Sequence, residues 1–179
     1  ISNLAAPSSY VGPTRVFGFS AEEGREGGLP LVRTVSDYCD EDGRTGWMPH
    51  GHRSNFHPVH SGPHSMPDSL VEAINAFILS CATRQLRGQG DAHNSMLVHV
   101  TRFNRVQKVV HEQVQAYVNN VKQRLSLGID EKKLLSELKT LWERDFVPTS
   151  NEVSESLATP DECKLPDWAD VRAQPLNVL

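Results

Sequence analysis

Cysteines and long hydrophobic runs are scarce in this sequence, and each scarcity excludes a class of protein. The 179 residues include three cysteines, Cys39, Cys81 and Cys163, which are odd in number and far apart. That pattern argues against a disulfide scaffold and for a reducing compartment. No hydrophobic run is long enough to cross a bilayer, and residues 1–9 lack the features of a signal peptide. We therefore expect a cytoplasmic protein with no membrane contact, and the missing initiator methionine indicates part of a longer protein.

Motifs for nucleophilic or nucleotide chemistry are also missing. The chain contains no Gly-x-Ser-x-Gly, no Gly-x-x-x-x-Gly-Lys-[Ser/Thr] and no Gly-x-Gly-x-x-Gly pattern. Acidic residues cluster at 22–23 and 40–42, but both stretches are typical of loops. Paired carboxylates need a rigid frame for acid–base work. We therefore predict no catalytic residue and no cofactor bound by this chain itself.

Histidines gather in one short stretch, between residues 50 and 64: His50, His52, His57, His60 and His64. Such a tract could ligate zinc, and a metal-dependent hydrolase is one interpretation of it. No cysteine lies nearby, and no pair of these histidines sits on a predicted helix at the four-residue spacing of zinc proteases. A polar loop in which histidine is a turn-tolerant residue is favoured, so we predict no native metal site.

Apolar residues recur at three- and four-residue steps in three segments, which predicts helices over 67–87, 103–127 and 130–146. The stretch before them is rich in glycine, proline and charge and shows little periodicity. A structureless stretch of that length is unusual inside a compact domain. The predicted organisation is an irregular lead-in arm with short strands at 1–66, a helical core at 67–147 and short C-terminal helices at 148–179.

Residues that start or stop helices mark the ends of these segments. Ser69 and Glu72 have the spacing of a capping box at the start of the first helix. Gly88 and Gly128 are natural C-terminal stops for the first and second helices. Pro148 is expected to end the third, because proline lacks the backbone donor that a helix interior needs.

One short segment departs from the helical pattern. Residues 96–101, Met96 to Thr101, are β-branched and almost uncharged, as in a strand buried on both faces. From Phe103 onward the apolar residues take helical spacing. The sequence therefore predicts a strand at 96–101 that passes directly into a helix. The expected fold class is mainly α, a helical bundle-like domain with one or a few short strands.

The charge of the chain is segregated. Residues 84–144 hold 11 basic and 6 acidic residues, a net charge of +5, whereas residues 1–83 carry −4 and residues 145–179 carry −5. A basic centre indicates a polyanion site or a solvated helix surface. The candidate nucleic-acid-binding residues are Arg84, Arg87, Arg102, Arg105 and Lys108.

These five cations divide by their position on the predicted helices. Arg84 and Arg87 end a helix, where cations also complement the helix dipole. Arg102, Arg105 and Lys108 stand at a helix start, where the dipole disfavours cations. That placement makes sense if an anion binds there, because a helix N-terminus already attracts one. Contacts of this kind give affinity for phosphate without reading sequence.

Three stretches resemble a known family. Residues 93–103, HNSMLVHVTRF, closely resemble the HNSMLIHVSRF signature of the Z-one domain, found in large bacterial proteins classed as endonucleases. Residues 67–77 are similar to the P-x-SL-x-x-AI-x-x-F helix of that family. The opening residues 10–12 and 16–18, YVG and VFG, are similar to its YIG and FFG elements. The resemblance covers most of the chain from about Tyr10.

The resemblance implies a context that the residues alone do not give. Proteins with this domain have a superfamily-two helicase ATPase core and are associated with restriction-like and phage-defence DNA systems. This chain would follow the first ATPase lobe, cross a helical insertion and enter the second lobe at 96–101. The nucleotide-binding lysine and the acidic metal motif would lie upstream, so ATP and Mg²⁺ are implied for the parent protein only. No nuclease motif is visible in the sequence.

Two functions remain as alternatives. The first is the central segment of a helicase-like, DNA-acting ATPase of a bacterial restriction or defence system. The segment would give nucleic-acid contact and coupling without a complete catalytic site, with DNA and the remaining ATPase lobes as partners. The second is a helical protein-interaction module with no nucleic-acid role. In that case the helix at 103–127 would bury a partner, and its basic residues would be rim charge.

Overall fold

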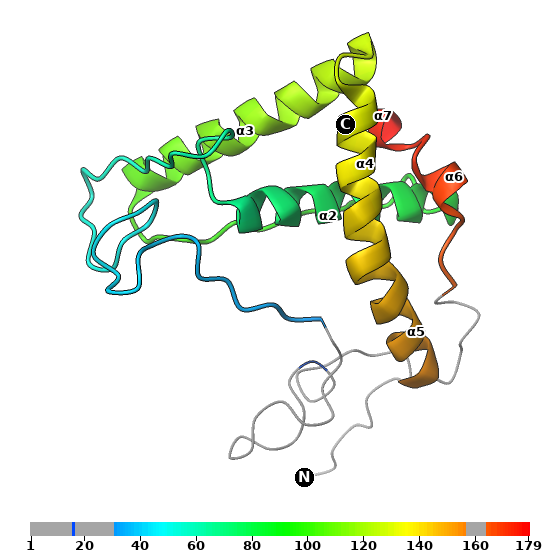
Figure 1. The fold of residues 1–179 in the computed structure, drawn as a ribbon, viewed down its shortest axis with the longest axis horizontal. Helices are drawn as coiled ribbons and strands as arrows, with labels where there is room; N and C mark the ends of the chain where they lie inside the picture. The colour runs from blue at the N-terminus through cyan, green and yellow to red at the C-terminus, as the bar shows by residue number, and fades with distance from the viewer. Residues whose placement is uncertain (1–15, 17–30, 157–163) are drawn as a thin grey trace. The chain divides into compact units, whose positions relative to one another are not determined.

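The computed structural model describes residue 16, residues 31–156 and residues 164–179, and these are mainly helical (Figure 1). The prediction of a mainly helical fold is therefore confirmed. The helices have the following bounds: α2 is Asp68–Leu86, α3 is Asn104–Leu127, α4 is Glu131–Leu141, the π-helix η1 is Trp142–Phe146, α5 is Val147–Ser156, α6 is Trp168–Val171 and α7 is Pro175–Val178. None of the helices found in these residues is long and apolar enough to span a bilayer.

The chain divides into two compact units. The larger comprises residues 35–141 and 166–179 and holds α2, α3, α4, α6 and α7. The described part of the smaller comprises residue 16 and residues 31–34, 142–156 and 164–165, with η1 and α5. Apart from Val16, the first 30 residues of the predicted lead-in arm lie outside the described residues, as does Cys163.

Apolar stripes of α2, α3 and α4 form the core of the larger unit. The helix α2 contacts α4, α6 and α7, and α3 contacts α4 and α7; Figure 1 shows α4 crossing α2. A hydrogen bond of 2.8 Å from the Tyr117 hydroxyl to the Asn75 side-chain oxygen joins α3 to α2 in the interior. The buried apolar residues of these helices are Ile74, Ile78, Leu79, Ala82, Val106, Val110, Tyr117, Val121, Leu134, Leu138 and Leu141.

The predicted helix stops are confirmed, but the predicted capping box is wrong. Gly88 and Gly128 follow α2 and α3 with φ of +72° and +65°, the left-handed conformation that glycine adopts most easily. At the other end of α2, Pro67 is the N-cap residue and Ser69 already lies in the helix. Ser69 instead donates its N–H and its hydroxyl to the Asp37 carboxylate, over 2.8 and 2.6 Å. A carboxylate from a distant part of the chain thus replaces the local cap.

The predicted strand at 96–101 is not formed, and none of the described residues forms a strand. The sequence pattern is still visible in the burial of the segment. Met96, Val98 and Val100 face α3 and line with it a cavity of about 220 Å³. Leu97 between them is 88% exposed, and His99 is exposed. A strand needs a neighbour to accept and donate backbone hydrogen bonds, and no described segment pairs with this one.

Pro148 does not end the third helix, contrary to prediction. The π-helix η1 follows α4 in the chain, and α5 continues through Pro148 as far as Ser156. Proline cannot donate the backbone hydrogen bond of a regular helix at this point, and the wider turn of the π-helix η1 lies directly before it. In the smaller unit, Asp145 pairs with Arg33 over 2.7 Å and with Arg144 over 2.9 Å. Hydrogen bonds and charge from these arginines hold the pKa of Asp145 below its ordinary value.

Candidate functional site

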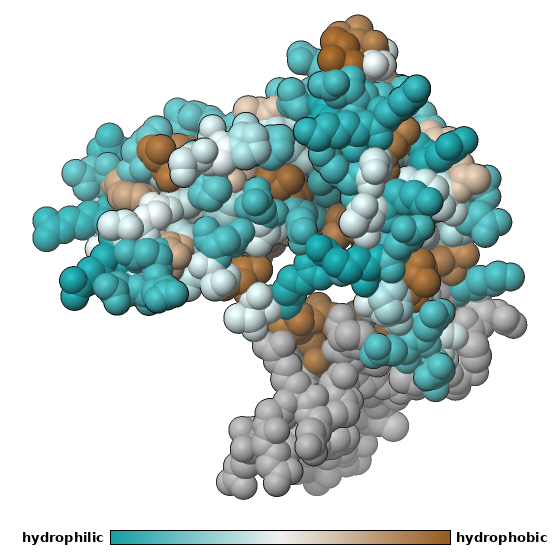
Figure 2. Space-filling model, viewed as in Figure 1, coloured by the Kyte–Doolittle hydropathy of each residue, from teal (hydrophilic) through white to brown (hydrophobic). Residues whose placement is uncertain are grey.

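Three of the candidate cations share the start of α3. Arg102 directly precedes the N-cap residue Phe103, and Arg105 and Lys108 follow in the first two turns. Residues three apart on a helix lie on neighbouring turns of one side. All three side chains are exposed, and none has an ion-pair partner within the described residues. The guanidinium carbon of Arg102 lies 5.1 Å from the centroid of the Phe103 ring. The surface at this end of α3 is largely hydrophilic (Figure 2).

The start of α3 lacks the groups that usually neutralise a helix N-terminus. Phe103 offers no capping side chain, and the first turn contains no acidic residue. The unpaired N–H groups of a first turn carry roughly half a positive charge. The side chains of Arg102, Arg105 and Lys108 add to that charge instead of cancelling it. The result is a local positive field that suits a phosphate or another anion.

Hydrogen bonds around Thr101 fix the position of this helix start. The Thr101 hydroxyl oxygen accepts the Phe103 N–H over 3.2 Å and lies 2.7 Å from His52 Nε2. The Gln107 side-chain amide donates to the Thr101 carbonyl over 2.6 Å. Thr101 itself is buried. These hydrogen bonds therefore fix the backbone from which the three cations project.

The other two candidate cations, Arg84 and Arg87, lie at the end of α2, where their surroundings differ from those at the start of α3. Arg84, near the end of α2, donates to the His93 carbonyl over 3.4 Å and to the Asn94 side-chain oxygen over 3.1 Å. Asn94 in turn donates to the Cys81 sulfur over 2.9 Å. Arg87 is the C-cap residue of α2 and also interacts with other groups. Arg84 thus anchors the segment after α2, whereas Arg102, Arg105 and Lys108 form no hydrogen bond or ion pair with another described residue, and Arg102 contacts the Phe103 ring.

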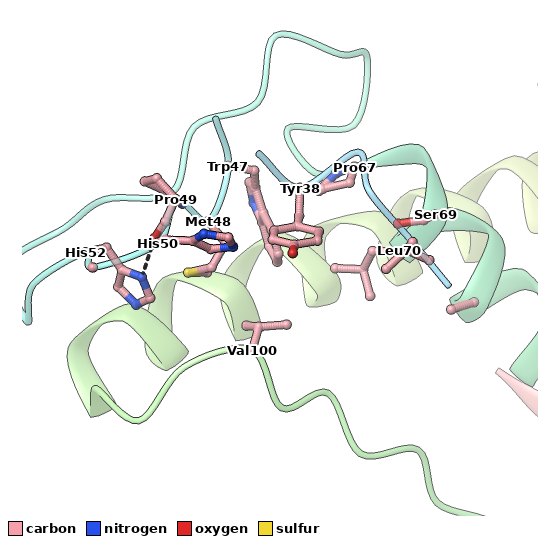
Figure 3. A pocket seen from close by; sticks show the side chains of 13 residues that line it. Tyr38, Trp47, Met48, Pro49, His50, His52, Pro67, Ser69, Leu70 and Val100 are labelled. Carbon is pink, nitrogen blue, oxygen red and sulfur yellow. Dashed lines mark hydrogen bonds between the residues drawn. The ribbon is translucent and has the colours of Figure 1, made fainter. Parts of the chain in front are cut away.

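A cavity of about 500 Å³ lies beside the segment that leads into α3 (Figure 3). We call it the aromatic pocket. In Figure 3 the rings of Tyr38, Trp47 and His50 lie across the cavity from Val100. The Trp47 indole is buried and donates to the Gln113 side-chain oxygen of α3 over 2.9 Å, which fixes one wall. The pocket is lined by Val35, Tyr38, Trp47, Met48, Pro49, His50, Gly51, His52, Pro67, Ser69, Leu70, Ala73 and Val100.

Two glycines shape the loop that carries the pocket walls. Gly46 has φ of +119°, and a Cβ there would lie 2.7 Å from the Cys39 Cα. Gly43 has φ of +67°, and a Cβ there would clash with the His50 ring. The loop between them is closed by Asp40, which accepts the N–H groups of Arg44 and Thr45. Hydrogen bonds from Thr45 and Arg44 hold the pKa of Asp40 below its ordinary value.

One carboxylate and one phenol near these elements have shifted pKa values. Partial burial acts to raise the pKa of Asp37, but the hydrogen bonds from Ser69 and the charge of His60 outweigh it and lower the pKa overall. Burial raises the pKa of Tyr117, against the opposing effect of its hydrogen bond to Asn75. Both groups serve the packing of α2 and α3, and neither lines the aromatic pocket.

The histidine-rich loop is ordered by packing. His52 binds the Pro49 carbonyl through Nδ1 over 2.9 Å, and its ring meets the edge of Phe103 at 5.6 Å between centroids. The His60 Nδ1 accepts the Gly62 N–H over 3.0 Å. The His64 ring lies 4.9 Å from the Tyr117 ring. Within residues 31–156 and 164–179, no three histidine, cysteine or carboxylate side chains come together in a way that could hold a metal ion.

Comparison with known families gives one match. The model of the Z1 domain family matches residues 69–179, which is more than half of the chain. The chain belongs to the Z1 domain family. No curated protein and no solved structure matches it. The matched part of the Z1 domain begins in α2 and includes the signature at 93–103, whereas the similar residues at 10–18 lie before it.

The aromatic pocket of this Z1 domain was missed by sequence reasoning. Four of its lining residues, Ser69, Leu70, Ala73 and Val100, lie inside the family match, and the rest precede it. The available signal was the run of aromatic, proline and histidine residues between 38 and 52 in a stretch without periodicity. Its residues reach the pocket through contacts across 50 or more positions, for example Trp47 with Gln113, and no local pattern records such contacts.

Proposed function

We propose that this Z1 domain contacts nucleic acid through the start of α3, as part of a helicase-like, DNA-acting ATPase of a bacterial restriction or defence system. Its role is binding and coupling, without a complete catalytic site. The remaining ATPase lobes and DNA are its partners. ATP and Mg²⁺ belong to those lobes, because this sequence has no phosphate loop. The resemblance of residues 93–103 and membership of the Z1 family support this context.

The observation that carries the proposal is the uncompensated positive charge at the start of α3. Arg105 and Lys108 are exposed, lack described carboxylate partners and lie in the first two turns of α3, the first of which contains no acid. Surface cations usually cost little, but cations at a helix N-terminus oppose the dipole and destabilise the helix. When an anion binds there, the electrostatic interaction of the same charges becomes favourable. A phosphate backbone supplies such anions at regular intervals.

The competing interaction module finds less support in α3. That alternative needs the apolar face of α3 to bury a partner. The most apolar positions of this face, Val106, Val110, Tyr117 and Val121, are already buried within the chain. Exposed apolar residues remain at Leu97, at Leu127, the last residue of α3, and at Ile129 in the turn that follows. Figure 2 shows hydrophobic surface at this end of α3. A dimeric gel-filtration profile together with absent DNA binding favours the module.

The test is DNA affinity measured by fluorescence anisotropy across a salt series. We expect the double variant R105E/K108E to lose two phosphate contacts, so the slope of log affinity against log salt falls by about 2 in magnitude. The matched control is K132E/K133E, which reverses two exposed lysines in the first turn of α4. Equal affinity and equal salt slope in the wild-type protein and R105E/K108E would refute the proposal.

A further inference from the structure

The aromatic pocket has the size and lining of a site for a flat, apolar group. Its volume of about 500 Å³ falls in the range of small-ligand sites. The buried side chains of Trp47, Met48 and Pro67 give it firm apolar walls. The rings of Tyr38 and His50 lie 6.2 Å apart between centroids, on the more open side. Aromatic walls of this kind favour stacking with another ring.

Some polar groups of the pocket already form hydrogen bonds within the protein, and others do not. The Trp47 indole N–H binds Gln113, the Ser69 hydroxyl binds Asp37, and both His52 ring nitrogens have partners. The Tyr38 hydroxyl and the ring nitrogens of His50 form no hydrogen bond with any described residue. A ligand with polar atoms on the edge of a ring can therefore find donors and acceptors here. An aliphatic side chain would leave them unused.

The pocket adjoins the cations at the start of α3. Val100 lines the pocket, and the Cα of Arg102, two residues further on, is at most about 7 Å from that of Val100. His52 forms another wall, and its ring contacts Phe103, over which the Arg102 guanidinium lies. Positive charge therefore borders an aromatic cavity. A nucleotide has the complementary arrangement, a flat base joined through a sugar to a phosphate.

We propose that the aromatic pocket takes up an unpaired base of single-stranded nucleic acid while Arg102 and Arg105 hold the adjacent phosphates. This inference rests on the proposed function, and it specifies the form of nucleic acid that the site prefers. A base inside a duplex is stacked and paired, so it cannot enter a pocket without leaving the helix. Single strands expose their bases, and stacking of bases on aromatic side chains is tolerant of sequence.

The first measurement uses the full chain without any variant. A single-stranded DNA oligonucleotide carries 2-aminopurine, whose fluorescence is quenched when it stacks on an aromatic ring. We expect quenching or a spectral shift on binding, and preference for the single strand over the same sequence as a duplex. Anisotropy is then compared for an intact oligonucleotide and one of the same length with abasic sites. We expect the abasic strand to bind about tenfold more weakly.

Two variants locate the effect in the pocket. Tyr38→Leu removes a ring while keeping apolar volume, and His50→Ala removes the other open-side ring. We expect each to weaken binding of the intact strand severalfold and to leave binding of the abasic strand unchanged. The matched control is His57→Ala, because His57 is an exposed histidine of the same loop that does not line the pocket. Thermal melting of each variant confirms that it is folded.

The outcomes separate the two proposals. If intact and abasic strands bind equally and 2-aminopurine is unaffected, bases do not enter the pocket, while phosphate contact at α3 stands. Preference for duplex overturns the pocket proposal in the same way. If no DNA binds at low salt, the proposed function fails and the pocket proposal fails with it. Should Tyr38→Leu not fold, the wild-type 2-aminopurine and abasic measurements still decide the question.

Discussion

The two long helices of this domain begin in opposite electrostatic surroundings. The first residue of α2 is Asp68, and Asp37 accepts two hydrogen bonds from Ser69 in the same turn. The first turn of α3 contains no acid and has no capping side chain; Arg105 lies in it, Arg102 just before it and Lys108 just after it. Carboxylates thus neutralise the orphan N–H groups and the dipole of α2. At α3 the same backbone charge is reinforced.

The start of α2 therefore serves folding, whereas the start of α3 is available for binding. Each unfavourable charge in a first turn costs about 0.3–1 kcal/mol at low ionic strength. The helix α3 tolerates this cost because its interior face, with Val106, Val110 and Val121, is buried. Packing therefore holds α3 in place while its first turn remains available to an anion.

The largest expected effect comes from reversing the charge at α3. The variant R105E/K108E should bind DNA roughly 40-fold more weakly than the wild-type protein near physiological salt, because two phosphate contacts are lost. The same substitutions should leave unfolding unchanged or raise its free energy by about 0.5 kcal/mol, because anions suit a first turn. Urea denaturation and anisotropy measure the two effects. Loss of both stability and affinity would show that these cations support the fold.

The second-largest effect is expected from a substitution that tests whether packing of its interior face holds α3 in place. Tyr117→Phe removes the hydroxyl that donates to Asn75, and both residues are buried. We expect the free energy of unfolding to fall by about 1–3 kcal/mol, because the Asn75 oxygen loses its donor inside the protein. DNA affinity should not change. The control Gln115→Ala, which removes an exposed hydrogen bond to Asn119, should have a much smaller effect in urea denaturation.

Removing the carboxylate at α2 should have a smaller effect, and one that depends on pH. Asp37→Ala is expected to lower the unfolding free energy by about 1 kcal/mol at neutral pH, as for other helix caps. The folded state lowers the pKa of Asp37 below its ordinary value of 3.8. Its contribution is therefore complete above pH 3.8 and is lost as the pH falls through the folded pKa. A stability difference that stays constant down to pH 2 would contradict this assignment.

Local sequence patterns predicted the parts of this fold that depend on local contacts. The periodic spacing of apolar residues marked α2 and α3, and Gly88 and Gly128 marked their ends, because helical hydrogen bonds join residues four apart. The prediction of a strand at 96–101 was wrong because strand pairing requires a second segment, and the local pattern does not contain one. The prediction of a capping box was wrong because α2 begins before Ser69, and Ser69 donates its N–H and its hydroxyl to the Asp37 carboxylate, 32 positions away.

The candidate site likewise combines features that local contacts determine with features that depend on distant parts of the chain. The positions of Arg102, Arg105 and Lys108 at a helix start follow from local periodicity, and α3 does begin there. Their contact with nucleic acid remains a prediction. The aromatic pocket joins residues between 35 and 100, so it depends on how the chain folds back and could not be found from spacing. The separate role of Arg84 also depends on a distant partner, Asn94.

The smallest expected effect comes from giving α3 the first residue of α2. Asn104→Asp places a carboxylate where α2 has Asp68, and Asn104 is exposed. We expect the free energy of unfolding to rise by about 0.5 kcal/mol, while DNA affinity falls a few-fold because the new charge repels phosphate. The control Asn104→Gln changes the side chain without adding charge. If Asn104→Asp gains stability and keeps full affinity, the dipole argument holds but the phosphates do not approach the first turn. If it loses stability, the start of α3 is not the uncompensated helix end on which the contrast with α2 depends.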